Sequence, residues 1–312
     1  MLYQNSDAIY WKLADQELEH NVEVVKISER EFCRMHTPPI VCQQSYINWL
    51  EHEEGEIDFA DSRTSFLELL DHVAKFLDIE LGDNREKVDV YTCGDLSFFE
   101  QLKESGKFST HELKLLKRQI LSSESYFIPE KRVVYLANLS INHAAEEAAH
   151  YIKYVCSGRE PKRTREDAFY ANILHEALAF FGSKLINPKR KCFHEQEFKN
   201  LIQYFDTMRI PGDRRLEFET ACIVLDFLKA DRHKLGGSRF FDCLKPDIFF
   251  SVTHALGYML GDKLFYAVMS ERVSKDEVRE LFFDGWRKEG EPLIAYYDLR
   301  KKLKGVKLPR RM

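Results

Sequence analysis

The expected fold and site follow from one stretch of sequence, Asn142-His143-Ala144-Ala145-Glu146-Glu147-Ala148-Ala149-His150-Tyr151-Ile152. Asn142 is a good N-cap, and the alanines and glutamates after it favour a helix, so we predict one over about 143–155. Because a helix turns by about 100° per residue, four ionisable residues share one broad face. They are His143, Glu146, Glu147 and His150, and the small alanines between them leave room for another group to approach.

This ionisable face has two interpretations. It is either an exposed face with a favourable Glu-to-His pair one turn apart, or a metal site. Glu146 and His150 have the i, i+4 spacing that lets two side chains hold one ion, and Glu147 is placed to act as a general base on a metal-bound water. The apolar segments 133–136 and 151–152 on either side favour the metal site.

One element downstream lies a second stretch, Ile173-Leu174-His175-Glu176-Ala177-Leu178-Ala179-Phe180-Phe181. Together the two stretches resemble the gluzincin zinc metallopeptidases, in which an HExxH helix supplies two histidine ligands and the base, and the next long helix supplies a glutamate. The resemblance implies Zn²⁺ held by Glu146, His150 and Glu176, Glu147 as the base, and a peptide or protein as substrate. The chain departs from the family at Glu146, where the first histidine ligand is expected. Two anionic ligands neutralise zinc more completely than one, which weakens its effect on bound water.

The segment 245–264 is predicted to be an apolar helix with Gly257 and Gly261 one turn apart, a spacing that lets another helix come close. It is similar to a GYxxG helix that packs against the third-ligand helix in several gluzincin groups. If its other face meets the metal, His254 and Tyr258 are candidate catalytic residues that donate a hydrogen bond to the oxyanion. The alternative is that both are satisfied core residues.

Period-two alternation predicts a strand over 87–93. The segments 126–128 and 132–136, on either side of Pro129-Glu130-Lys131, predict a hairpin whose last strand leads into the site helix. In the gluzincins the edge of that strand aligns an extended peptide by strand addition. An ordinary α+β hairpin is the alternative. Further helices are predicted over 65–77, 166–182, 195–208 and 215–229.

We therefore expect an α+β, mostly helical fold, with a zincin-like domain over 63–272 in which a small sheet precedes the site helix. Residues 1–62 are expected to form an N-terminal accessory segment, and 273–312 a C-terminal helical extension with a basic tail. Glu17 and His20 repeat the ExxH spacing, which leaves open a carboxylate-rich di-metal protein. A catalytically inactive, zincin-like binding or regulatory protein is the main alternative to the enzyme.

Composition narrows the class of protein. The net charge of −5 argues against a nucleic-acid binder, and no apolar run approaches the length of a membrane span. The start of the sequence lacks the features of a secretory signal. Seven scattered cysteines without a CxxC spacing indicate neither a disulfide framework nor a thiolate zinc site, which fits a reducing cytoplasm.

Overall fold

The computed structural model describes residues 62–92, 102–110, 113, 125–136, 140–158, 163–207, 215–229, 240–241, 244–283, 286, 288 and 290–308. The described residues fall into two compact units, a smaller one within 193–252 and a larger one within 53–192 and 253–312. Nearly all of the predicted accessory segment 1–62, including Glu17 and His20, lies outside the described residues, as does the end of the basic tail.

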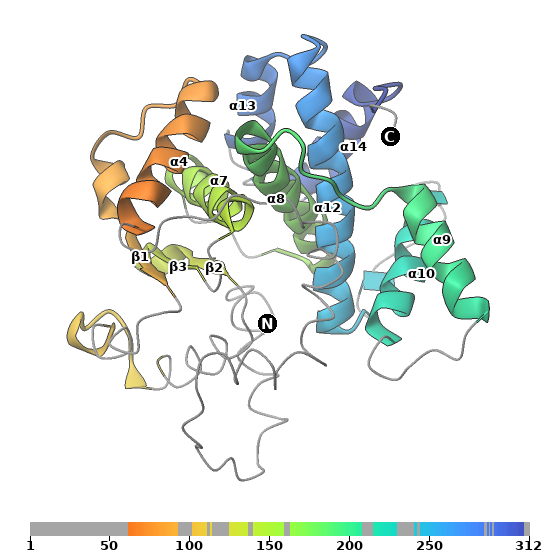
Figure 1. Cartoon of the computed structure of the whole chain (residues 1–312), viewed down its shortest axis with the longest axis horizontal. Coiled ribbons are helices and arrows are strands. Elements are labelled where there is room, and N and C mark those ends of the chain that lie inside the picture. Colours follow the sequence, from red (N-terminus) through yellow and green to blue (C-terminus); the bar gives the residue numbers. More distant parts are fainter. Residues whose placement is uncertain are drawn as a thin grey trace. The chain divides into compact units, whose positions relative to one another are not determined.

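The larger unit, Glu53–Cys192 with Thr253–Met312, is mostly helical with one small sheet, which confirms the predicted α+β class (Figure 1). Its elements, in chain order, are α4 Ser62–Phe76, η2 Gly82–Lys87, β1 Asp89–Thr92, β2 Tyr126–Ile128, η3 Pro129–Lys131, β3 Val133–Leu136, α7 Ile141–Ser157, α8 Arg165–Ile186, α12 Pro246–Met269 (from Thr253 onward), α13 Lys275–Phe283 and α14 Glu291–Lys302.

The sheet has the strand order β1-β3-β2 (Figure 1). β2 and β3 form the predicted antiparallel hairpin, and β1 pairs with the other side of β3 in parallel. β3 leads into α7 as expected, but it is the central strand, and all four of its residues are buried. The prediction that a peptide adds to the edge of β3 is therefore wrong, because the backbone groups of β3 are already engaged on both sides.

The helix α7 begins two residues earlier than predicted. Its N-cap is Ser140, whose hydroxyl accepts a hydrogen bond from the His143 amide at 3.4 Å, and the prediction of Asn142 as the cap is wrong. Asn142 lies inside the first turn and is fully buried. The alanines of α7 are buried against its neighbours, so that a Cβ on Gly182 of α8 would lie 2.9 Å from that of Ala149. α7 thus packs closely against α8, because the facing side chains are small.

The helix α12 packs against α8 through its two glycines, as its sequence predicts. A Cβ on Gly257 would collide with the Cβ of Glu176 and lie 2.8 Å from the carbonyl oxygen of Ile173. A Cβ on Gly261 would lie 2.9 Å from that of Phe180. This close approach brings the His254 turn of α12 beside Glu176.

We expect Gly257→Ala to lower the free energy of unfolding by about 1–3 kcal/mol, because the added methyl group cannot fit without moving α12 away from α8. Denaturant unfolding measures the loss. Ile294→Ala on α14, whose side chain is 56% exposed, is the control and should change stability by less than about 0.5 kcal/mol. Equal stability of the two variants would contradict the close contact.

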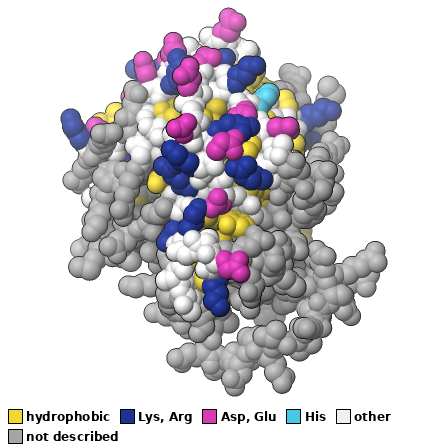
Figure 2. Space-filling view, turned by 90° about the vertical axis from the view of Figure 1, so that its left-hand side faces the viewer, with side chains coloured by type: hydrophobic (Ala, Val, Ile, Leu, Met, Phe, Trp, Pro, Cys, Tyr) yellow, Lys and Arg dark blue, Asp and Glu magenta, His cyan; other side chains and the backbone are white. Residues whose placement is uncertain are grey.

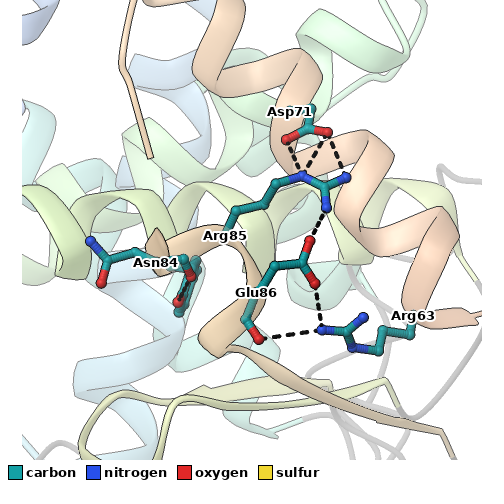
Figure 3. A network of polar contacts seen from close by, with 6 residues as sticks. Arg63, Asp71, Asn84, Arg85 and Glu86 are labelled. Atoms are coloured by element: carbon teal, nitrogen blue, oxygen red, sulfur yellow. Dashed lines mark hydrogen bonds and ion pairs between the residues drawn. The ribbon is translucent and has the colours of Figure 1, made fainter. Parts of the chain in front are cut away.

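A polar network ties η2 to α4 (Figure 3). Arg85 donates to both carboxylate oxygens of Asp71 at 2.8–3.0 Å, and Glu86 bridges Arg85 and Arg63. The backbone oxygen of Asn84 accepts a hydrogen bond from the Tyr151 hydroxyl of α7 at 2.5 Å. The charged groups are largely solvated, so we regard the network as a tether of η2 rather than a functional site.

The predicted C-terminal extension packs into the larger unit. α14 contacts α8, where the rings of Tyr296 and Tyr170 lie 5.1 Å apart, and α13 contacts α7 and α8. The Gly290 amide before α14 donates to the Asp167 carboxylate at the start of α8 at 3.0–3.1 Å. The last helices are therefore part of the compact body that carries α7 and α8.

The smaller unit contains the predicted helices α9 Glu195–Thr207 and α10 Arg215–Lys229, which pack together. Phe205 and Phe218 meet edge to face with ring centroids 5.9 Å apart. Among the described helices, none combines the length and hydropathy needed to cross a membrane.

On the face drawn in Figure 2, basic and acidic side chains are interspersed among the coloured residues rather than gathered by sign.

Candidate functional site

The larger unit carries the predicted site residues on three helices. α7 carries Glu146, Glu147 and His150, α8 carries Glu176, and α12 carries His254 and Tyr258. The ionisable face of α7 is buried, with exposures of 4% for His143, 6% for Glu146 and 8% for Glu147. The interpretation of this face as a solvated surface is therefore wrong.

A carboxylate and two imidazoles form the more open part of the site. One oxygen of Glu176 lies 3.8 Å from His150 Nε2, and the other lies 3.3 Å from His254 Nε2. We call these three residues the His-Glu-His cluster. Their side chains are 23%, 14% and 37% exposed for His150, Glu176 and His254, so solvent reaches the cluster.

Burial lowers the pKa of His150, although the neighbouring Glu176 carboxylate works in the opposite direction. The imidazole is therefore neutral near pH 7, the state in which a histidine nitrogen binds a metal or accepts a proton. His175, which precedes Glu176 in the sequence, stacks instead on Trp286, with ring centroids 5.5 Å apart and the rings inclined by 22°.

Glu146 forms the closed part of the site. Arg190 donates from Nη1 to Glu146 Oε1 at 2.8 Å, and the two side chains are only 1% and 8% exposed. Burial works against the charged form of Glu146, but the charge of Arg190, then that of His143, and hydrogen bonds from Tyr258 and Arg190 outweigh it and lower the pKa. Glu146 is therefore an ionised carboxylate with a protein cation beside it.

Tyr258 belongs to the same closed part. Its hydroxyl is hydrogen-bonded to Glu146, and burial followed by the Glu146 charge raises its pKa well above the usual value. The phenol remains protonated and donates to Glu146. The predicted role of Tyr258 as an oxyanion donor thus competes with a partner that the structure already supplies.

Further hydrogen bonds and one more ion pair lie around Arg190. Its Nη1 also donates to Ser183 Oγ at 2.6 Å, and Lys184 Nζ donates to the Arg190 carbonyl oxygen at 2.9 Å. Lys184 pairs with Asp262 at 2.8 Å, and both side chains are less than a tenth exposed. The positive and negative charges are matched within this buried group, which costs less than burying any one of them alone.

The zinc set implied by the resemblance fits these residues only in part. His150 and Glu176 lie together and have suitable donor atoms, but Glu146 is already neutralised by Arg190 at 2.8 Å. His254, rather than Glu146, lies beside the second carboxylate oxygen of Glu176. Two imidazoles and one carboxylate make a donor set typical of hydrolytic zinc sites. The three donor atoms do not all lie within 4.8 Å of one another, so binding one ion would require a side-chain rotation.

A second group of possible metal ligands lies among the described residues. Ligand atoms of Cys192, His194 and Asp262 lie within 4.8 Å of one another, and this group could hold a metal ion. The sequence does not reveal this group, because the cysteines follow no metal-binding spacing. Asp262 is already paired with Lys184, and the Cys192 thiol donates to the Tyr258 carbonyl oxygen at 3.6 Å.

Comparisons with known proteins add no family to this geometry: no family model, no curated protein and no solved structure matches the chain.

Proposed function

We propose that the protein is a metal-dependent hydrolase acting on peptide bonds, with Zn²⁺ held by the His-Glu-His cluster. The observation that carries this proposal is the position of Glu176 between His150 and His254, at 3.8 and 3.3 Å. Nitrogen and oxygen ligands of one zinc ion stand a similar distance apart, because each lies about 2.0–2.2 Å from the metal. The cluster is also the part of the site that solvent reaches.

Each residue has a role in this proposal. His150, Glu176 and His254 hold the ion, and Glu147, one turn before His150 on α7, accepts a proton from the attacking water. Bound zinc would acidify that water and polarise the substrate carbonyl. Glu146 and Tyr258 form the buried part of the site and do not contact the substrate.

A second candidate is a binding or regulatory protein with the same fold and no metal. The Glu146–Arg190 pair favours it, because the residue that aligns with the first ligand of the gluzincins is paired with a guanidinium at 2.8 Å. In that case the solvent-accessible imidazoles and Glu176 would bind a peptide rather than cleave it.

A cleavage assay with a peptide library separates the two candidates. For the hydrolase we expect cleavage that stops with a chelator and returns with added Zn²⁺. Peptide binding that is indifferent to chelator, without any cleavage, would overturn the hydrolase and favour the binding protein. Cys192→Ser is the control for the second metal group, and it should leave chelator-sensitive cleavage intact.

A further inference from the structure

We propose that Arg190 is a positioning residue that excludes residue 146 from the metal's ligands and thereby leaves the third position to His254. The inference rests on the proposed metal site, and it explains why a glutamate stands at position 146. Two ligand sets share His150 and Glu176 and differ in the third ligand, which is either Glu146 or His254. In this inference the buried arginine determines which of the two sets binds the ion.

The backbone of Arg190 is fixed at both of its polar groups. α8 ends at Ile186, and the carbonyl oxygen of its C-cap Asn187 accepts a hydrogen bond from the Arg190 amide at 3.0 Å. The Asn187 side chain accepts from the Lys189 amide at 3.2 Å, which closes a tight turn. At the other side, the Arg190 carbonyl oxygen accepts from the ammonium group of Lys184. The turn after α8 therefore aims the arginine side chain back toward α7.

The guanidinium is held as firmly as the backbone. It donates hydrogen bonds to Glu146 and Ser183. It also lies over the rings of Phe180 and Tyr258, with its central carbon 4.7 and 5.3 Å from their centroids. Arginine suits such a place because its planar group hydrogen-bonds at the edge and stacks on its face. A side chain that is 1% exposed and so surrounded cannot swing away to admit an ion.

Electrostatics then decides the ligand set. A zinc ion bound to Glu146 would add two positive charges beside the arginine charge, in a site from which water is excluded. On the other side of Glu176, His254 presents a partly exposed imidazole in surroundings that solvent reaches. The ion is therefore more stable against His254 than against Glu146.

The same reasoning predicts that restoring an imidazole at position 146 is not sufficient to create the family's site. Glu146→His would leave Arg190 buried without its carboxylate and would place the new ring beside a fixed cation. Removing the arginine at the same time, in Glu146→His/Arg190→Met, takes that cation away and keeps a long apolar side chain in its place. The gain in metal affinity should thus depend on Arg190.

Zinc titration calorimetry on four proteins tests the inference: the wild type, Glu146→Leu/Arg190→Met, Glu146→His and Glu146→His/Arg190→Met. We expect the first two to bind zinc with Kd values within about threefold of each other, because residue 146 is not a ligand. We expect the last to bind at least about tenfold more tightly than Glu146→His alone. Circular dichroism spectra report whether each variant is folded.

The outcomes separate this inference from the proposed function. Zinc binding that is lost in Glu146→Leu/Arg190→Met but present in the wild type would overturn the inference and make Glu146 a ligand. Equal affinities of Glu146→His and Glu146→His/Arg190→Met would overturn it as well. If the wild type binds no zinc, the proposed function fails, while a tenfold gain that requires removal of Arg190 would still support the exclusion.

Discussion

Arg190→Met is expected to lower the free energy of unfolding by about 3–5 kcal/mol, because it leaves the buried Glu146 carboxylate without its cation. The pKa of Glu146 is held low in the folded protein by Arg190, so the carboxylate either remains charged in an apolar place or takes up a proton at a cost. Urea unfolding followed by circular dichroism measures the change.

An exposed arginine pair provides the matched control. Arg215 contacts Glu219 at 2.7 Å within α10, but its side chain is 76% exposed. Arg215→Met should cost no more than about 1 kcal/mol, since surface ion pairs contribute little. Similar losses for both variants would show that burial of the Glu146–Arg190 pair does not set its energy.

Glu147→Gln is expected to reduce the turnover of peptide hydrolysis by about 10²–10⁴-fold while leaving metal content unchanged. The amide has nearly the shape of the carboxylate but cannot accept a proton, so only the base is removed. Turnover and metal content are measured on the same preparation. Glu280→Gln changes an exposed glutamate of α13 and serves as the control.

Two other results would assign Glu147 differently. Unchanged turnover would mean that another group accepts the proton. Loss of metal together with turnover would mean that Glu147, and not His254, completes the ligand set.

Local patterns in the sequence predict most of the fold. Helices α7, α8, α9, α10 and α12 and the β2–β3 hairpin all follow from apolar periodicity, breakers and turn residues. The two glycines of α12 also predict its contact with α8, since a missing side chain marks a close approach. Such signals lie within a few residues of one another and need no tertiary information.

The central position of β3 could not be read in the same way. Its parallel partner β1 lies some forty residues earlier in the chain, and nothing in either strand specifies that pairing. The N-cap was wrong for a simpler reason. Both Ser140 and Asn142 are good caps, and the choice depends on how the chain enters α7 from β3.

Arg190 accounts for the main revision of the candidate site. The segment 187–191 reads as a basic loop, and basic loops are usually solvated. Only the turn after α8 places one of these cations against a carboxylate 44 residues away. The need of the buried glutamates for a counter-charge was predictable, whereas the source of that charge was not. His254 was predicted to contact a substrate, whereas the structure places its Nε2 3.3 Å from Glu176.

Elemental analysis of the purified protein and its ligand variants tests the central claim most directly. The protein should be prepared without an immobilised-metal column. We expect close to one divalent metal ion per chain in the wild type and in Glu146→Leu/Arg190→Met, and almost none in folded His254→Ala. A wild-type protein that contains no metal, and whose melting temperature responds to neither zinc nor chelator, would contradict the account.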